Sequence, residues 1–497
     1  MKAVYEFLEL SAEKYPNKIA IKDDTASITY NELLKNSKFV SNSIQNMINH
    51  GQTISLFSEN SISFTITYFG ILMAGGIVHI IPPNSSEKQI QFQIQKVKPV
   101  IIVCSETLEN KITRNQYKHI LISDLINNSL SSKINHNTIH DKFNEVSSII
   151  FTSGTTGIPK GVKLKHENII FVTNNIIKII GVRSDDIEIN PLQLSHSFGL
   201  GCLHTTIAQG ATAIIFRNSI NLKEIIDAVT INKATGFVGV PATFQKILLN
   251  YKEEFKEAGK NFHYLLTNSA PMPKDDVQEI IDLFPLTDFF TYYGLTEASR
   301  STFLLFNNDI TKIESVGKPA PNVEIKIITN NGNTSNQHEI GEVLINGPNV
   351  IDEYWAGTAE ESKINDGWLA TGDLGFFDND GYLYLKGRKD DIINVGGEKV
   401  SPTEIELTIK QLDKVQDVGV IGIPDRTFGE IPVAFIVTKF NLETNEILSH
   451  CIKTLERYKV PQNIIFIDNI PQNESGKIER NTLREMYAKQ YGVNTME

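Results

Sequence analysis

Short apolar runs alternate with amphipathic segments along most of this chain. The apolar runs have the length of buried strands, and we expect strands at "PVIIVC" (99–104), "SSIIF" (147–151), "ATAIIF" (211–216) and "ATGFVGV" (234–240). Apolar residues at helical spacing follow in "NLKEIIDAVTIN" and "PATFQKILLNYKEEF". This alternation of strands and helices predicts an α/β fold built of layers, with parallel strands.

One segment, Ser61 to Pro83, carries no formal charge and is long enough to cross a bilayer. Two features favour a buried position inside a globular protein instead. Gly75-Gly76 interrupts the segment, and Pro82-Pro83 ends it. We therefore predict a buried helix over Ile62–Ala74, then a turn and a short strand, "IVHII".

The pattern changes twice towards the C-terminus. Between Val316 and Trp355 it becomes one of alternating strands around an "NNGN" turn, which predicts a β-rich subdomain. From "YLYLKGRKDD" onward a new pattern begins, with strands "VQDVGVIGI" and "PVAFIVTKF" and a short helix near 443–457. We predict a large N-terminal domain over 1–389, of layered α/β sheets plus the β-rich subdomain, and a small α+β C-terminal domain over 390–497.

Composition narrows the class of protein. The 497 residues are 41% hydrophobic and 21% charged, which is ordinary for a soluble globular enzyme. A net charge of -11 argues against a broad nucleic-acid surface, which needs a basic face. Cys104, Cys202 and Cys451 lie far apart, and the N-terminal segment, which carries acids inside its apolar run, is expected to be no signal peptide. These features favour the reducing cytoplasm, with no membrane span.

The stretch "IIFTSGTTGIPKG" (149–161) has the composition of a phosphate-binding loop. Its glycines let backbone N–H groups approach a ligand closely, its hydroxyls add donors, and Lys160 and Lys163 add positive charge. The Walker pattern is absent, because Pro159 stands where its second glycine would be. We expect a strand that ends at Phe151 and a phosphate loop of another type.

Five motifs in order give this chain a resemblance to a known superfamily. They are "TSGTTGIPKG" (152–161), "YYGLTEAS" (292–299), "WLATGDLG" (368–375), "LKGRKDDIINVGGEKVSPTEIE" (385–406) and "NESGKIER" (473–480). Together they resemble the signature motifs of the adenylate-forming enzymes, which include acyl-CoA synthetases, adenylation domains of peptide synthetases and luciferases. The resemblance covers essentially the whole chain.

The resemblance implies a two-step reaction. A carboxylic acid attacks the α-phosphate of ATP to give an acyl-adenylate, with Mg²⁺ present, and a thiol then takes the acyl group as a thioester. Such chemistry depends on positioned cations and hydrogen-bond donors. By resemblance, the loop holds the β- and γ-phosphates through Thr152, Ser153, Gly154, Thr155, Thr156, Gly157 and Lys160.

The second motif implies roles near the nucleotide. Thr296 is expected to hydrogen-bond phosphate, and Glu297 to bind the magnesium ion, which prefers carboxylate and phosphate oxygens. Tyr293 and Gly294 belong to the same motif, and Tyr293 is expected to stack on adenine; its alternative is plain core packing. "TNSAPMP" (267–273) resembles the adenine-contacting segment, with Asn268, Ser269 and Ala270 nearest the base.

The C-terminal motifs imply the remaining catalytic parts. Asp373 is expected to accept the ribose hydroxyls, with support from Arg388. Asp390 stands at the hinge about which relatives turn the small domain between the two half-reactions. Gly396 and Gly397 belong to the loop that serves thioester formation, and Lys477 resembles the lysine that bridges the carboxylate and the α-phosphate.

The acid pocket is expected around "PLQLSHSFGLG" (191–201). No acidic residue lies between Pro191 and Gly210, which argues against an amino-acid substrate and for an uncharged fatty or aryl acid. We expect His196 to serve in catalysis and in this pocket. The apolar walls predicted by resemblance are Phe237, Val240, Pro241 and Leu295, and Arg300 flanks the same cavity or lies on the surface.

Several alternatives remain at this point. A metal site at His136 and His140, or a Cys–His nucleophile at Cys202, lacks supporting residues. A non-catalytic relative and a luciferase-like oxygenase also share the fold. The acceptor is coenzyme A or the phosphopantetheine of an acyl carrier protein; the free-standing chain favours coenzyme A.

Overall fold

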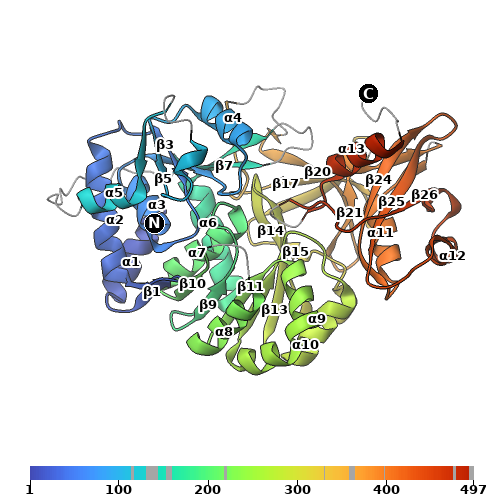
Figure 1. Ribbon diagram of the computed structural model, residues 1–497, viewed down its shortest axis with the longest axis horizontal. Helices are drawn as coiled ribbons and strands as arrows, with labels where there is room; N and C mark the ends of the chain where they lie inside the picture. The colour runs from blue at the N-terminus through green and yellow to red at the C-terminus, as the bar shows by residue number, and fades with distance from the viewer. Residues whose placement is uncertain are drawn as a thin grey trace. The chain divides into compact units, whose positions relative to one another are not determined.

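The computed structural model describes residues 1–112, 117–129, 144–152, 159–217, 221–329, 331–356, 364–396, 398–473 and 477–491. These residues form two compact units. The first comprises Met1–Ile325 and Ile345–Leu369, and the second comprises Lys326–Leu344 and Ala370–Glu497. Figure 1 shows the elements of both units in the order of the chain. The predicted domain limits at 389 and 390 divide the chain differently and stay a prediction.

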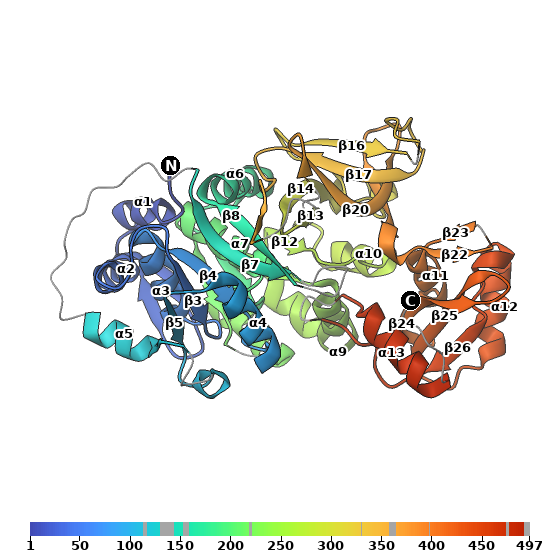
Figure 2. The ribbon, with the colours of Figure 1, turned by 90° about the horizontal axis from the view of Figure 1, so that it is seen from above.

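The first unit contains a seven-stranded sheet. Its central strands are parallel, and their residues are buried and mostly apolar, as a sheet covered on both faces requires. The strand order is β18 (Tyr354–Trp355), β8 (Lys160–Lys165), β7 (Val146–Thr152), β4 (Ile77–Ile81), β3 (Thr53–Phe57), β5 (Ile101–Cys104) and β6 (His119–Leu121). β8 and β18 are antiparallel to their neighbours, and Figure 2 shows β7 and β8 side by side.

A nine-stranded sheet forms the rest of the unit's β-structure. Six consecutive strands, from β1 to β13 in the sheet order, run parallel, and the strands at the two edges are antiparallel. The order is β15 (Lys318–Pro319), β14 (Ala298–Leu305), β13 (Asp288–Leu295), β12 (Tyr264–Thr267), β11 (Gly236–Gly239), β9 (Ile187–Asn190), β10 (Thr212–Ile215), β1 (Ile19–Lys22) and β2 (Ser27–Thr29).

Helices cover these sheets and supply the main core. One buried cluster joins strands of both sheets to the helices α1 (Glu6–Lys14), α2 (Tyr30–Gln45), α3 (Ile62–Met73), α5 (Ile122–Ser129), α6 (His166–Ile176) and α7 (Ser197–Gln209). α4 (Glu87–Val97) packs beside β4. Below the nine-stranded sheet in Figure 1 lie α8 (Leu222–Asn232), α9 (Pro241–Ala258) and α10 (Lys274–Leu283).

The uncharged segment 61–83 folds as predicted. Ser61 caps α3 by accepting a hydrogen bond from the Phe64 N–H, and Gly75 takes a positive φ of 79° where the helix ends. β4 then covers the five residues of "IVHII". Among the described residues, no helix is long and apolar enough to cross a membrane.

Most strands of the second unit belong to two further sheets. The first has the order β16 (Glu324–Ile328), β17 (Gly341–Asn346), β20 (Trp368–Phe377) and β19 (Ile364–Asn365), and β21 (Leu383–Arg388) also pairs with β20. The second has the order β23 (Glu398–Val400), β22 (Ile393–Val395), β25 (Gly429–Thr438) and β24 (Val415–Asp425), and β26 (Asn463–Phe466) also pairs with β25.

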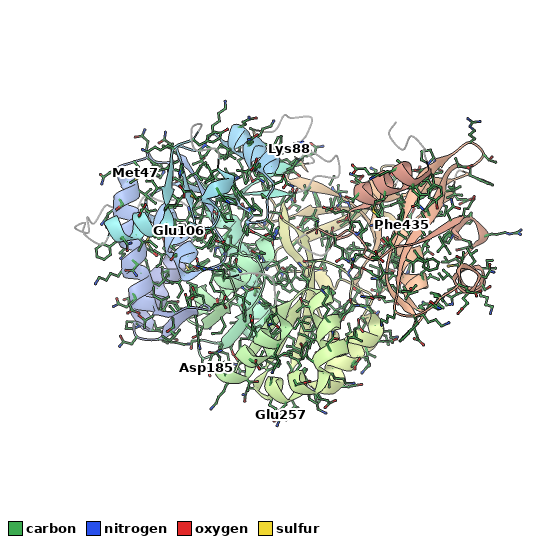
Figure 3. All side chains as sticks on the ribbon, in the orientation of Figure 1. Met47, Lys88, Glu106, Asp185, Glu257 and Phe435 are labelled. Atoms are coloured by element: carbon green, nitrogen blue, oxygen red, sulfur yellow. The ribbon has the colours of Figure 1, made fainter. Side chains whose placement is uncertain are left out.

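Strand alternation gives this last sheet a core on each face. On β25, Ala434 and Ile436 pack with α11 (Pro402–Lys410) and α12 (Thr444–Thr454). Val433 and Phe435, which is labelled in Figure 3, pack on the other face with α13 (Arg480–Tyr491). The period of two residues per strand accounts for both clusters. The predicted α/β class, with a large N-terminal and a smaller C-terminal part, is confirmed.

The three cysteines are free and buried, one in β5, one in α7 and one in α12. Burial raises the pKa of Cys104 to about 12 and that of Cys451 to about 11. Burial also raises the pKa of Cys202 well above its usual value. Each thiol therefore stays protonated and unreactive at neutral pH.

Candidate active site

Four adjacent parallel strands of the nine-stranded sheet run towards one edge, and most predicted site residues of the first unit follow them there. β9, β11, β12 and β13 are adjacent, and Thr267 lies opposite both Gly239 and Thr291. The segments that begin with Pro191, Val240 and Asn268 therefore leave the sheet at neighbouring positions, whereas β13 continues as a strand to Leu295. The carboxyl ends of parallel strands are where α/β proteins bind their ligands.

Thr296 and Glu297 form the tight turn between β13 and β14. Leu295 pairs with Ala298, so these two residues are the whole turn. The strand register shifts at Gly294, where a Cβ would lie 2.4 Å from the backbone nitrogen of Arg300. Only glycine fits this approach. The turn leaves both side chains half-buried, and the Thr296 hydroxyl lies 3.5 Å from the Ser197 hydroxyl at the start of α7.

His196, Val240 and Pro241 stand at the beginning of helices on this edge. His196 is the N-cap residue of α7, and its backbone carbonyl accepts a hydrogen bond from the Leu200 N–H. Val240 is the N-cap residue of α9, and Pro241 occupies the first helical position, where a missing N–H costs nothing. The structure thus places these three residues, which the sequence predicts to line the acid pocket, at one edge of the sheet.

Asn268, Ser269 and Ala270 follow β12 at the same edge and are half-buried. Ser269 has a φ of +90°, which is a strained conformation for a residue other than glycine. Such strain concentrates at functional sites. Their predicted contact with adenine stays a prediction.

Phe237 and Tyr293 are buried more deeply. Phe237 is fully buried in β11, with its ring centroid 5.3 Å from that of Phe244 and 5.4 Å from that of Phe255, both in α9. These contacts are those of a core residue, so we leave Phe237 out of the pocket proposed below. Tyr293 is 7% exposed, and its predicted stacking on adenine also stays a prediction.

Arg300 lies inside the protein and not on its surface, which was one of the two alternatives for this residue. Its side chain is 3% exposed, and its guanidinium lies 5.0 Å from the centre of the Tyr292 ring. A Cβ at Gly201 would lie 2.2 Å from the guanidinium, so the glycine in α7 makes room for the arginine. Arg300 also has a φ of +55°. The guanidinium therefore links the Thr296–Glu297 hairpin to the start of α7.

A second buried group lies on β9 beneath this edge. The Tyr264 hydroxyl donates a 2.6 Å hydrogen bond to Oε2 of Glu188, while Oε1 of Glu188 has no partner among the described residues. Burial raises the pKa of Glu188 to about 8, so the carboxyl group is protonated at neutral pH. No sequence motif predicts this pair.

The Cys202–His204 alternative finds no support. Burial lowers the pKa of His204 to about 3. Its Nε2 forms a 3.0 Å hydrogen bond with the Tyr68 hydroxyl. A buried neutral thiol near a buried neutral imidazole is no activated nucleophile. The alternative metal residues, His136 and His140, lie outside the described residues.

The loop that the sequence predicts to bind phosphate connects β7 to β8 along the chain. Thr152 and Lys160 face each other as the last pair of the two strands, so both ends of the loop start from one edge. The strand extends one residue beyond the predicted end at Phe151. Ser153, Gly154, Thr155, Thr156 and Gly157 lie outside the described residues, and their role in phosphate binding stays a prediction.

Glu297 has a partner that the sequence did not reveal. The hydroxyl of Tyr354 donates a 3.0 Å hydrogen bond to Oε1 of Glu297. Tyr354 is in β18, which pairs with β8. The "DEYW" stretch that contains it lies outside the five motifs described above.

In the second unit, Asp373 and Arg388 are neighbours. They are directly opposite in β20 and β21, and Nη1 of Arg388 donates to Oδ1 of Asp373 at 2.8 Å. The same nitrogen donates to the Thr371 carbonyl at 3.1 Å. Asp373 is 7% exposed. Because its buried carboxylate is bonded to this arginine, the arginine fixes its orientation.

The other predicted residues of the second unit lie apart along the chain. Asp390 is in a short 3₁₀ turn, 389–391, directly after β21. Gly396 has a φ of +62° at the turn between β22 and β23, and Gly397 lies outside the described residues. Lys477 is exposed, and its backbone N–H donates to the Asn473 side chain at 3.0 Å.

A magnesium ion and ATP fit the donors present in the first unit. Mg²⁺ commonly uses one or two carboxylates together with substrate phosphate oxygens. Glu297 supplies one half-buried carboxylate, with one oxygen already oriented by Tyr354. Among the described residues, no group of three or more His, Cys, Asp and Glu side chains forms a closed metal site.

Comparison with known proteins places these features in one family. Residues 8–355 match the AMP-binding enzyme family, and residues 404–477 match the C-terminal domain of the same enzymes. A 2-succinylbenzoate–CoA ligase of Geobacillus sp. (strain WCH70) is 28% identical over 476 residues, which cover 95% of each chain.

Solved structures agree over almost the full length. The o-succinylbenzoate CoA synthetase of Bacillus subtilis, in complex with its acyl-adenylate intermediate, is 26% identical and superposes with a TM-score of 0.88 over 99% of each chain. ATP-bound MatB from Rhodopseudomonas palustris is 25% identical, with a TM-score of 0.90 over 99% of each chain. The predicted superfamily is confirmed: the chain belongs to the AMP-binding enzyme family.

Proposed function

We propose that this protein is an ATP-dependent acid–coenzyme A ligase that activates an uncharged aryl or fatty acid. The observation that carries the proposal is the edge of the nine-stranded sheet, where β13 extends to the Thr296–Glu297 turn and Thr296 lies beside Ser197 at the start of α7. A carboxylate and a hydroxyl on a rigid hairpin suit a magnesium-bound nucleotide.

The comparisons confirm the predicted reaction class, an AMP-forming ligation of a carboxylic acid to a thiol. Relatives are coenzyme A ligases by name, and one solved relative contains ATP and a magnesium ion. ATP, Mg²⁺ and coenzyme A are accordingly the co-substrates and the metal ion of this reaction.

The individual roles remain our proposal. Glu297 holds the magnesium ion, and Thr296 donates its hydroxyl to a phosphate oxygen. Asp373, oriented by Arg388, accepts the ribose hydroxyls. Lys477 stabilises the negative charge shared by the acid and the α-phosphate. Each group acts through its position and its charge or dipole. Positioning and electrostatic stabilisation provide most of the rate acceleration in enzymatic reactions of phosphates.

The nature of the acid follows from the residues at the strand edge. His196 and Leu295 are half-buried, Val240 and Pro241 are apolar, and no acidic residue lies between Pro191 and Gly210. A substrate ammonium group would find no carboxylate there, and an unpaired buried charge is costly. An aryl or fatty acid suits this lining. The 2-succinylbenzoate named for the relatives is one member of the panel to test.

The test is acid-dependent exchange of pyrophosphate into ATP over a panel of aryl, fatty and amino acids. We expect exchange with an aryl or fatty acid and none with amino acids. A preference for an amino acid would overturn the assignment of the acid, and a lack of exchange with every acid would overturn the ligase itself. Replacement His196→Asp should weaken use of the preferred acid by at least tenfold, because the new carboxylate is unpaired.

The acceptor is tested separately. With ATP, Mg²⁺ and the preferred acid present, free coenzyme A should give an acyl thioester detectable by mass spectrometry. If the enzyme exchanges pyrophosphate but loads only a phosphopantetheinylated carrier protein, the carrier protein is the acceptor. We further propose a cytoplasmic location, which the three free cysteines support.

A further inference from the structure

Residues 347–355, which we name the strap, connect two parts of the proposed active site. The strap leaves the end of β17 and ends in β18. On one side it contacts β8 and α6, which follow the phosphate loop. On the other side it contacts the hairpin that carries Thr296 and Glu297.

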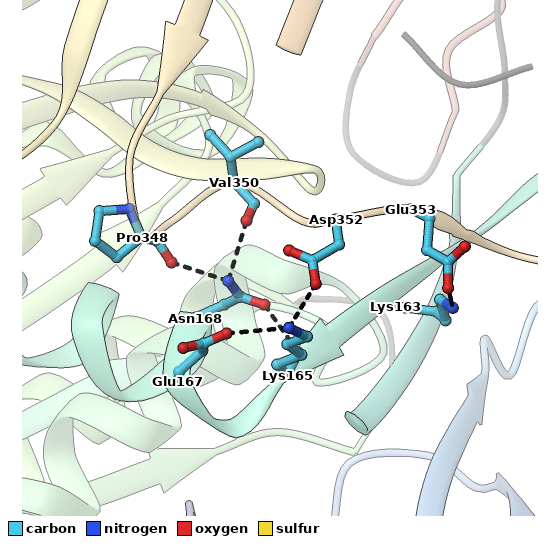
Figure 4. Close-up of polar contacts among 8 residues, drawn as sticks. All are labelled: Lys163, Lys165, Glu167, Asn168, Pro348, Val350, Asp352 and Glu353. Carbon is cyan, nitrogen blue, oxygen red and sulfur yellow. Dashed lines mark hydrogen bonds and ion pairs between the residues drawn. The ribbon is translucent and has the colours of Figure 1, made fainter. Parts of the chain in front are cut away.

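Contacts with β8 and α6 fix the strap along its length (Figure 4). The Asn168 carboxamide donates to the carbonyls of Pro348 and Val350 at 2.9 and 3.1 Å. Lys165 pairs with Asp352 at 2.5 Å, and Lys163 pairs with Glu353. Asn168 is buried, whereas Asp352 and Glu353 are exposed, so the amide contributes more to stability than the two ion pairs.

The strap is fixed equally well to the hairpin. The Ile351 N–H donates to the Glu297 carbonyl at 3.0 Å, and Val350 forms an isolated bridge with Ala298. The Asn349 carboxamide donates to the Ser299 carbonyl at 3.1 Å. These bonds hold the backbone of Glu297, and the side chain has a separate contact.

Tyr354 makes that contact, at the end of the strap where β18 pairs with β8. It pairs with Val162 in β8, and its hydroxyl donates to Oε1 of Glu297 at 3.0 Å. The Lys160 ammonium lies 5.2 Å from the centre of the same ring. One aromatic side chain thus touches the carboxylate proposed for magnesium and the lysine proposed for phosphate.

We infer that Tyr354 is a positioning residue, which holds the Glu297 carboxylate in the orientation that the divalent cation needs. The inference rests on the proposed function of Glu297. A neutral phenol donor occupies one carboxylate oxygen and removes none of the negative charge. Partners of this kind orient metal ligands, and their loss commonly weakens metal binding by about 10- to 100-fold.

The first measurement is binding without turnover. Tyr354→Phe removes the hydroxyl and keeps the ring and the strand pairing. Mg²⁺ is titrated against the purified protein with an ATP analogue that cannot be cleaved between the α- and β-phosphates, and the rise in melting temperature is followed. We expect the Mg²⁺ midpoint to rise by about tenfold. Tyr251→Phe, which removes a phenol oxygen from α9, is the matched control and should leave the midpoint unchanged.

The second measurement is kinetic. In pyrophosphate exchange, Tyr354→Phe should need about tenfold more Mg²⁺ for half-maximal rate, with the KM for the acid unchanged. The two substitutions Tyr354→Phe and Glu297→Gln should be strongly non-additive, because the tyrosine acts through the glutamate. If Tyr354 only supported the fold, Tyr354→Phe would lower the free energy of unfolding, and its effect on the rate would add in full to that of Glu297→Gln.

An unchanged Mg²⁺ midpoint in Tyr354→Phe would overturn the inference, and so would full additivity with Glu297→Gln. Failure of the proposed function looks different. In that case the wild-type protein would show no acid-dependent exchange, whatever residue stands at position 354.

Discussion

Arg388 lies directly opposite Asp373 across β20 and β21 and donates a 2.8 Å hydrogen bond to its carboxylate. The arginine is anchored as well to the carbonyl of Thr371, so the pair has one fixed geometry. An ion pair held in this way presents the remaining carboxylate oxygen in a set direction.

The Asp373–Arg388 pair leads to a prediction about recognition of the nucleotide. Asp373→Asn should raise the KM for ATP by about tenfold, because a hydrogen bond to a charged group contributes roughly 1.5–3 kcal/mol. The wild type should discriminate against 2′-deoxy-ATP, and the variant should lose most of that discrimination. Equal discrimination in both proteins, measured by pyrophosphate exchange, would contradict the ribose assignment.

Lys477 gives a prediction that separates the two half-reactions. Lys477→Ala should slow adenylation by about 10²- to 10³-fold, the usual effect of removing one electrostatic stabiliser. Thioester formation from preformed acyl-adenylate should change far less. Lys489→Ala, on the exposed side of α13, is a matched control that should leave both rates unchanged. Equal slowing of both steps by Lys477→Ala would rule out the assigned role.

The hinge prediction concerns Asp390, in the short turn after β21. Proline fixes φ near −65° and removes the N–H, so Asp390→Pro restricts rotation of the backbone there. We expect acyl-adenylate to form at close to the normal rate and thioester formation to be blocked. Asp390→Ala keeps the backbone free and should retain both steps. Normal thioester turnover in the proline variant would refute a hinge at this residue.

Glu188 predicts a pH dependence of stability. Its pKa is raised by burial to about 8 in the folded protein, above the ordinary value near 4.5. The neutral form therefore stabilises the fold below pH 4.5, and this contribution is lost as the pH rises through 8. Between these values the free energy of unfolding should fall by up to about 1.4 kcal/mol per pH unit relative to Glu188→Gln.

Urea unfolding of both proteins at pH 5.5 and 7.5 measures this effect. The amide in Glu188→Gln still accepts the hydrogen bond from the Tyr264 hydroxyl, so packing is preserved. Parallel changes in the two proteins between these pH values would mean that Glu188 is ionised in the fold.

Local elements and motif positions were predictable because they depend on neighbours in the sequence. The strand "IVHII" covers Ile77–Ile81 as expected, and the helix expected over Ile62–Ala74 ends one residue earlier. Gly294 lies within β13, and the tight turn follows two residues later at Thr296 and Glu297. Apolar runs and glycine positions contain this information directly.

Pairings between distant residues were not predictable. Tyr354 meets Glu297 across 57 residues, through a strap whose sequence has no motif. Arg300 reads as a surface or pocket residue, since buried arginines are rare, and only the fold shows that Gly201 makes room for it. From the sequence alone, Glu188 is an ordinary polar residue in a short strand. Its burial becomes evident only when the strands that flank β9 in the sheet are known.

The burial of all three cysteines has a practical consequence for following this enzyme at work. Because no native thiol is available to maleimide dyes in the folded state, the protein needs no prior removal of cysteines before labelling. A single cysteine introduced at an exposed position of each compact unit, for example Lys223 in α8 and Lys489 in α13, would take a donor and an acceptor fluorophore. Energy transfer between the two dyes would then test whether the distance between these positions changes during turnover.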